Sequence, residues 1–242
     1  MAWWRENGIK VVCFDIDGTL YPKTILNRKM LATLFPHALT ALRFMKMRSL
    51  FRQSQNAVPT VPATLEGMRR RQAQLVLQRR GMPATEENLS RVEDAFVRHI
   101  YGRWEESYHN LRPFPHVKDA MVQMKDNGML LGVMSDFPVA GKIDSMGMSA
   151  LVDVAVSSEE SGYLKPHPAA FSYLLEKMGN PNPSVVLYIG DSYDKDVEGA
   201  YGMGMKSCLL AERRSIGGGK RTDFPHADLI CTSWADFSRQ FF

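Results

Sequence analysis

The sequence has little cysteine and lacks any long apolar run. Its three cysteines, Cys13, Cys208 and Cys231, are odd in number and far apart, and none has metal-ligand spacing. No apolar stretch approaches the roughly 18 residues that a membrane-spanning helix needs. Residues 1–7 also lack the charged-then-apolar order of a secretory signal. We therefore expect a cytoplasmic protein without a membrane partner.

Acidic residues are scarce in one part of the chain. Residues 22–112 contain 16 of the 30 Lys and Arg but 7 of the 26 Asp and Glu, which gives a local net charge of +9. Since the whole chain has a net charge of +4, the remainder carries −5. This asymmetry indicates two different surfaces. The basic surface of residues 22–112 either binds an anionic substrate or simply faces water.

The same middle segment lacks strand patterns. Its apolar residues recur at helical spacing over residues 31–51, 64–80 and 85–104. Thr85 is a predicted N-cap, because Glu86 and Glu87 stand in the first turn that follows it. We therefore expect residues 22–112 to form an inserted all-helical domain.

From residue 113 onward, short apolar strands alternate with helices. The predicted helices are residues 117–126, 139–146, 169–178 and 195–201. The predicted strands are residues 129–134, 152–156, 185–189, 207–210 and 228–231. This alternation predicts βαβ units. We expect an α/β core of residues 1–21 and 113–242, built as a Rossmann-like parallel sheet with helices on both faces.

Residues 11–20, with the sequence VVCFDIDGTL, combine a predicted strand with two carboxylates. Asp15 directly follows the apolar run, and in open parallel sheets ligands bind beyond the carboxyl ends of strands. An extended backbone from Asp15 to Asp17 would place both side chains on the same side. Two close carboxylates repel each other, which indicates a cation or a reaction at this point. An exposed Asp-x-Asp-Gly turn is the alternative.

Polar residues also follow or precede later elements of the core. Ser135 and Asp136 follow one predicted strand, Lys165 precedes a helix, and Asp191 and Asp196 follow another strand. Each has an ordinary structural interpretation as a helix cap, a solvated lysine or an exposed helix start. Their common order and their placement at strand ends favour one shared site.

In this order the residues resemble the four motifs of the haloacid dehalogenase-like (HAD) hydrolase superfamily. The resemblance covers roughly residues 9–21 and 113–232, with DxDGT at 15–19 and GDxxxxD at 190–196. The second of these forms is similar to that of many phosphatases in the superfamily. The resemblance implies a Mg²⁺-dependent hydrolase of a small phosphorylated metabolite. It also implies that residues 22–112 are a C1-type cap, which closes over the site and selects the substrate.

The resemblance implies catalytic roles for three residues. Asp15 would attack phosphorus and form an aspartyl-phosphate, and Lys165 would neutralise charge. Asp17 would protonate the leaving oxygen and then activate water. Family members that cleave carbon–halogen bonds lack an acid at the position of Asp17. A dehalogenase is therefore not expected.

The resemblance further implies two sets of binding residues. The phosphoryl group would be bound by Thr19, Ser135, Asp136 and Lys165. The Mg²⁺ ion would be held by Asp15, the Asp17 carbonyl, Asp191 and Asp196. An oxygen-rich site of this kind suits a hard cation.

Two other functions stay open. A phosphotransferase or phosphomutase needs the same residues and passes the phosphoryl group to a sugar. A non-catalytic protein would instead bind an anionic surface through the basic segment 28–55, although we expect no nucleic-acid partner. Within residues 22–112, the candidates for gripping a substrate's leaving group are Arg43, Lys46, Arg48 and Arg69–Arg71. The oligomeric state cannot be read from the sequence.

Overall fold

The structure is a computed structural model that describes residues 2–25, 27–28, 38–56, 63–211 and 223–242. Six parallel strands form one sheet. They are β1 (Val11–Phe14), β2 (Leu130–Ser135), β3 (Val154–Ser157), β4 (Val186–Gly190), β5 (Lys206–Leu210) and β6 (Leu229–Cys231). Their order, β3-β2-β1-β4-β5-β6, is that of a Rossmann fold. The predicted α/β, Rossmann-like parallel sheet is therefore confirmed.

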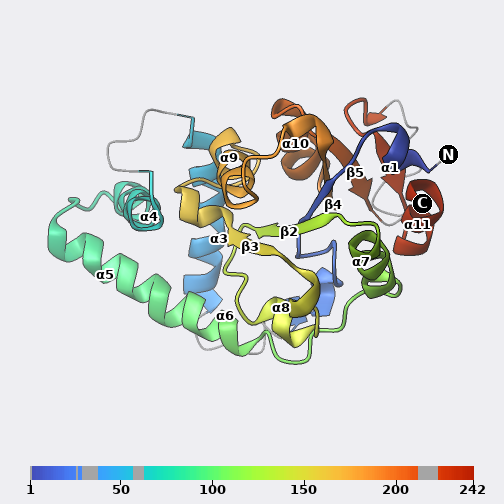
Figure 1. Cartoon of the computed structure of the whole chain (residues 1–242). Helices are drawn as coiled ribbons and strands as arrows, with labels where there is room; N and C mark the ends of the chain where they lie inside the picture. The colour runs from blue at the N-terminus through green and yellow to red at the C-terminus, as the bar shows by residue number, and fades with distance from the viewer. Residues whose placement is uncertain (1, 26, 29–37, 57–62, 212–222) are drawn as a thin grey trace.

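Helices cover both faces of this sheet (Figure 1). Val12 and Phe14 of β1 belong to the hydrophobic cluster that includes α7 (Val117–Asp126) and α11 (Trp234–Phe241). The alternate residues, Val11 and Cys13, pack in a second cluster with α9 (Pro168–Lys177) and α10 (Glu198–Gly202). Because side chains alternate between the faces of a strand, an all-apolar β1 is buried on both sides.

Helices α1 (Trp3–Glu6) and α11 were not predicted from the sequence, and they contact each other. The short helical turns are α8 (Lys142–Ser145), η3 (Ser149–Leu151), η4 (Ser158–Ser161), η5 (Pro183–Val185) and η6 (Tyr193–Val197). The predicted helix over 195–201 instead begins with the π-turn η6, in which the Ser192 carbonyl accepts from Asp196 N and Val197 N. This wider turn carries the Asp196 carboxylate to the Ser192 N–H.

The segment between β1 and α7 is helical throughout residues 38–56 and 63–112, apart from its connecting turns. It contains α3 (Ala38–Ser54), α4 (Leu65–Arg79), α5 (Glu86–Phe96), the π-helix η2 (Val97–Tyr101) and α6 (Gly102–Glu106). Thr85 caps α5, as predicted, by accepting from Asn88 N. The start of the predicted helix over 31–51 lies outside the described residues. In Figure 1 helices α4 and α5 of this segment lie to one side of the sheet.

Aromatic side chains hold the helical segment together. Phe44 of α3 makes edge-to-face contacts with Phe96, Tyr101 and Trp104, at ring-centroid distances of 5.0, 5.5 and 5.7 Å. These rings belong to the same hydrophobic cluster as Val12 and Phe14. The hydrophobic cluster therefore continues from the segment into the core on one face of the sheet, and the boundary of the segment as a separate domain stays a prediction.

The described residues contain no helix that is long and apolar enough to cross a membrane. All three cysteines are free and buried. Cys208 Sγ lies 3.8 Å from Cys231 Sγ, on the neighbouring strands β5 and β6. Burial raises the pKa of the Cys13 thiol to about 12. The expected cytoplasmic location stays a prediction.

A substitution pair in α10 tests the packing between α10 and α9. We expect Gly199→Ala to lower the free energy of unfolding by about 1–3 kcal/mol, because overpacking a core costs that much. The new methyl would lie 2.2 Å from the ring of Phe171, which is fully buried. Gly202→Ala is the control, since nothing lies within 4 Å of its Cβ. Urea unfolding should show the loss in the first variant alone, and equal effects would contradict this packing.

Candidate active site

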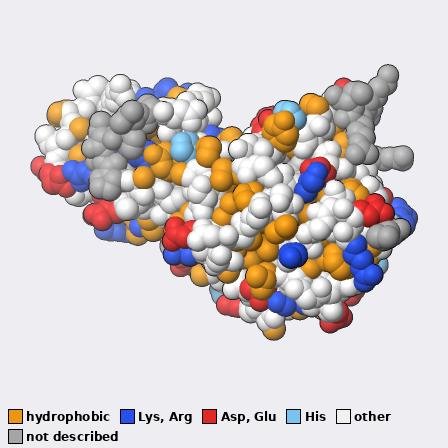
Figure 2. All heavy atoms as spheres, turned by 45° about the horizontal axis from the view of Figure 1, so that its top comes forward, with side chains coloured by type: hydrophobic (Ala, Val, Ile, Leu, Met, Phe, Trp, Pro, Cys, Tyr) orange, Lys and Arg blue, Asp and Glu red, His pale blue; other side chains and the backbone are white. Residues whose placement is uncertain are grey.

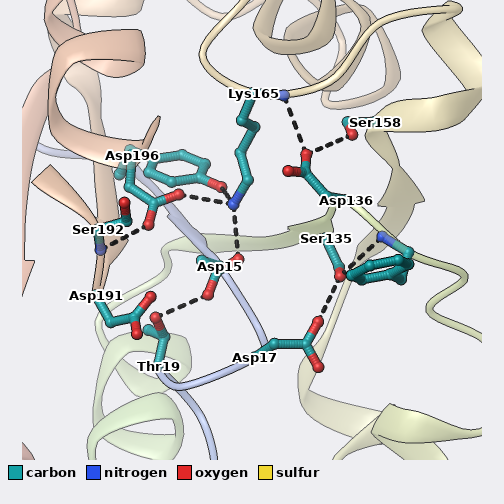
Figure 3. A network of polar contacts seen from close by, with 12 residues as sticks. Asp15, Asp17, Thr19, Ser135, Asp136, Ser158, Lys165, Asp191, Ser192 and Asp196 are labelled. Atoms are coloured by element: carbon teal, nitrogen blue, oxygen red, sulfur yellow. Dashed lines mark hydrogen bonds and ion pairs between the residues drawn. The ribbon is translucent and has the colours of Figure 1, made fainter. Parts of the chain in front are cut away.

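The carboxyl ends of three neighbouring strands bring the predicted residues together (Figure 3). Asp15 follows β1, Ser135 ends β2, and Asp191 follows β4. Lys165 precedes α9, and Asp196 lies in η6. This convergence follows from the parallel sheet, whose strands all end at the same edge.

Asp15 is held by donors on both of its carboxylate oxygens. Lys165 Nζ lies 2.6 Å from Oδ1, and Thr19 Oγ1 donates to Oδ2 at 3.0 Å. Burial raises the pKa of Asp15 to about 6, Lys165 opposes this rise, and the Asp196 and Asp17 carboxylates add to it. Thr19 is fully buried and does not line the cavity at the site. Its hydroxyl orients Asp15 in this structure.

Lys165 joins two of the predicted carboxylates. Besides the contact with Asp15, its Nζ lies 2.7 Å from Asp196 Oδ1 and donates to the Tyr188 hydroxyl at 3.2 Å. Burial acts to lower the pKa of Lys165, but Asp15 and Asp196 outweigh it and hold the pKa well above its usual value. The side chain is therefore a buried ammonium ion with one carboxylate on each side.

Asp17 lines the same cavity as Asp15, but its carboxylate has different partners. Ser135 Oγ donates to Asp17 Oδ2 at 2.7 Å, and Lys142 Nζ lies 2.9 and 2.7 Å from its two oxygens. The Tyr21 hydroxyl donates as well. Burial opposes ionisation, yet Lys142 and these hydroxyls hold the pKa of Asp17 below its usual range.

Lys142 and Tyr21 were not predicted as site residues. Lys142 is fully buried and lies over the rings of Tyr108 and Phe137. In the sequence, Lys142 stands inside a short apolar helical pattern. A lysine at such a position is usually exposed, so nothing in the sequence indicates its burial. Its role depends on the position of α8, which brings Nζ of Lys142 to the Asp17 carboxylate.

Three carboxylates form a group suited to a metal ion. Ligand atoms of Asp15, Asp191 and Asp196 all lie within 4.8 Å of one another. Burial and the nearby Asp15 raise the pKa of Asp191, and Lys23 opposes this rise from 2.5 Å. A compact set of anionic oxygens fits Mg²⁺, which prefers hard ligands. The predicted ligation by the Asp17 carbonyl stays a prediction.

Asp136 lines the cavity and faces the main chain of Lys165. Its Oδ1 accepts from Ser158 Oγ at 2.8 Å and from Lys165 N at 3.0 Å. Its Oδ2 lies 2.7 Å from Arg52 Nη2. Burial opposes ionisation, but Lys165 and Arg52, together with Arg48, lower the pKa of Asp136 to about 2. The predicted contact of Asp136 with a phosphoryl group stays a prediction.

Helix α3 covers the site. A cavity of about 220 Å³ is lined by the catalytic candidates Asp15, Asp17, Lys165, Asp191 and Asp196 on the sheet side. On the other side it is lined by Met45, Arg48, Ser49 and Arg52 of α3. A larger cavity, of about 620 Å³, includes Lys206 at the start of β5 and holds none of the predicted site residues.

Among the basic residues predicted to grip a substrate, Arg48 alone lines this cavity. It is buried and pairs with Glu159, so its charge is already neutralised. Arg71 donates to the Gly162 carbonyl, and Arg70 pairs with Glu86 on the surface. Arg52, which also lines the cavity, was not among the predicted residues.

Comparisons with known proteins agree with this geometry. The sequence model of the haloacid dehalogenase-like hydrolase family matches residues 9–204. A glyceraldehyde 3-phosphate phosphatase from Methanocaldococcus jannaschii is 32% identical over 134 residues, which cover 49% of this chain and 58% of that protein. The match therefore spans little more than half of that relative. A phosphoglycolate phosphatase from Shigella dysenteriae is 26% identical over 94% of this chain and 90% of its own length.

Solved structures share the fold at low sequence identity. A HAD phosphatase from Thermococcus onnurineus superposes with a TM-score of 0.60 at 20% identity, covering 96% of this chain and 97% of that one. The L-2-haloacid dehalogenase from Xanthobacter autotrophicus gives a TM-score of 0.58 at 18% identity, with coverage of 96% and 97%. Since the family match extends over most of the chain, the protein belongs to the haloacid dehalogenase-like hydrolases.

Proposed function

We propose that this hydrolase is a Mg²⁺-dependent phosphatase that cleaves a small phosphomonoester through an aspartyl-phosphate on Asp15. The observation that carries the proposal is the buried Asp15 carboxylate, held by Lys165 and Thr19 beside Asp191 and Asp196. The phosphatases among the relatives support the same reaction class. The cavity of about 220 Å³ suits a small substrate.

In the first step, Asp15 attacks phosphorus, a bond forms from its carboxylate oxygen, and the bond to the leaving oxygen breaks. A carboxylate approaches a phosphate dianion only where cations offset their repulsion. Lys165 supplies one such charge at 2.6 Å from Asp15. Mg²⁺ held by Asp15, Asp191 and Asp196 would supply further charge to offset the phosphoryl oxygens.

Asp17 carries the proton in both steps of the proposed reaction. It protonates the leaving oxygen and then accepts a proton from the water that attacks the aspartyl-phosphate. Lys142 holds the carboxylate form in this structure, which suits the second step. An adjacent phosphoryl dianion favours the protonated form by like-charge repulsion, which suits the first step.

Ser135 and Asp136 have separate tasks in this proposal. The Ser135 hydroxyl donates to Asp17 here, and it would turn to a phosphoryl oxygen once substrate enters. Asp136 already binds three donors, so we assign it to holding the Lys165 main chain.

The helical segment, residues 22–112, is the proposed cap. Helix α3 closes one side of the cavity, which limits the access of water to the phosphoenzyme. On the face drawn in Figure 2, basic and acidic side chains are interspersed over both lobes. The surface pairs Arg70–Glu86 and Arg91–Glu87 also place a carboxylate of the same segment beside two of its arginines. These features favour an enzyme over a protein that binds anionic surfaces. A phosphotransferase shares every residue named above, and no contact among the described residues favours it.

Asp15→Asn tests the nucleophile. We expect turnover of p-nitrophenyl phosphate to fall below about 1% of the wild-type rate, because a neutral amide cannot attack phosphorus. The fold should persist, since Lys165 keeps Asp196 as its ion partner. Circular dichroism checks the fold, and acid trapping of labelled phosphoenzyme checks the intermediate. A variant that keeps its activity would overturn the covalent mechanism.

Asp17→Asn tests the proton carrier. Phosphoenzyme formation should slow strongly with an alkyl phosphate and weakly with p-nitrophenyl phosphate, because nitrophenolate leaves without protonation. Single-turnover kinetics with both substrates measure this step. The variant leaves Lys142 without its carboxylate, so Asp17→Asn combined with Lys142→Met controls for a buried unpaired charge. Equal losses with the two substrates would argue against the role.

Removal of the metal tests the carboxylate group. We expect EDTA to abolish turnover and added Mg²⁺ to restore it. Asp191→Ala should raise the Mg²⁺ concentration needed for half-maximal activity by tenfold or more, about 1.4 kcal/mol of binding free energy. Asp194→Asn is the matched control, because this exposed carboxylate does not line the cavity. Full activity in EDTA would contradict the metal assignment.

A further inference from the structure

We propose that Arg52 is a positioning residue for Lys165, so that the helical segment helps to build the catalytic site it covers. The inference rests on the proposed function, because it takes Lys165 as the cation beside Asp15. Arg52 lies near the end of α3, and Lys165 lies 113 residues later in the chain.

Arg52 binds the main chain of Lys165 directly and also through Asp136. Its Nε donates to the Lys165 carbonyl at 2.9 Å, and its Nη2 lies 2.7 Å from Asp136 Oδ2. Asp136 Oδ1 in turn accepts from the Lys165 N–H at 3.0 Å, a contact drawn in Figure 3. The N–H and C=O groups of Lys165 are thus both held in one ring of three contacts.

A displacement of this main chain would reach the reacting atoms. The Lys165 side chain is 2% exposed, and its Nζ lies 2.6 Å from Asp15 and 2.7 Å from Asp196. Because the Lys165 side chain is packed on all sides, it cannot change its rotamer to compensate for a shift of the backbone. Misplacing a catalytic group by about 1 Å can cost on the order of 100-fold in rate.

Two neighbouring side chains bind the same loop without a hydrogen bond to Lys165. Gln55 donates to the Leu164 carbonyl at 2.9 Å and accepts from Leu164 N at 3.0 Å, and Arg71 donates to the Gly162 carbonyl. Arg48 binds a different segment, because it donates to the Asp136 carbonyl after β2. Arg52, by contrast, hydrogen-bonds to both Lys165 and the Asp136 carboxylate. The planar guanidinium suits two acceptors at once, whereas a lysine ammonium lacks that fork.

Arg52 also lines the cavity, with 26% of its side chain exposed, so it has a second potential role in gripping the substrate. The two roles differ in their kinetics. A gripping residue changes kcat/KM for a substrate with a matching leaving group and spares p-nitrophenyl phosphate. A positioning residue changes kcat for every phosphomonoester, because all of them react beside Lys165.

The first experiment compares Arg52→Met and Arg52→Lys with Arg70→Met, using p-nitrophenyl phosphate and saturating Mg²⁺. For Arg52→Met we expect kcat to fall tenfold or more while KM changes by less than about threefold. Arg52→Lys, which keeps the charge without the fork, should fall between this variant and the wild type. Arg70→Met removes a half-buried arginine of α4 that pairs with Glu86 and does not line the cavity, so it should stay within about twofold of the wild type.

The second experiment is a double-mutant cycle with Lys165→Met. If Arg52 acts through Lys165, adding Arg52→Met to Lys165→Met should lower kcat by less than about twofold further. A further loss equal to the full effect of Arg52→Met would overturn the inference. So would an unchanged kcat in Arg52→Met, or partial unfolding of both Arg52 variants in circular dichroism that accounts for their whole loss of activity. If Lys165→Met alone stays fully active, the proposed role of Lys165 in the reaction fails instead.

Discussion

The arrangement of the site depends on one buried ammonium ion. Asp15, Asp191 and Asp196 would repel one another at these distances, and Lys165 offsets that repulsion by contacting two of them. Removing Lys165 would leave these buried carboxylates without their shared cation, and breaking a buried ion pair in this way costs about 3–5 kcal/mol. The contacts that fix Lys165, from Asp136, Tyr188 and Arg52, therefore support the carboxylate group as a whole.

The sequence was sufficient to predict the sheet and the residues at its edge. Parallel strands end on the same side, so Asp15, Ser135 and Asp191 had to converge once the strands were identified. The partners of these residues were beyond prediction. Lys142 reaches Asp17 across 125 residues, and Arg52 reaches Lys165 across 113 residues. Such contacts follow from tertiary packing and leave no local pattern in the chain.

The composition of the helical segment suggested that its basic excess serves an anionic substrate or solvation. In the structure, part of this excess binds groups of the protein itself. Arg48 and Arg71 are buried and Arg52 lines the cavity, and all three bind carboxylates or main-chain carbonyls of the core. Such carbonyls would otherwise be buried without donors, which costs about 1–3 kcal/mol each. Part of the charge therefore joins the helices to the catalytic loop. Composition alone cannot separate that use from binding an anionic ligand.

The reactivity of the three buried cysteines reports local and global unfolding of the protein. None of the thiols is accessible in the folded chain, and a thiol reacts through its ionised, solvated form. Cys13 lies in the central strand, whereas Cys208 and Cys231 lie on the strands at one edge of the sheet. The order in which a thiol reagent labels them under native conditions therefore distinguishes fraying of that edge from global unfolding.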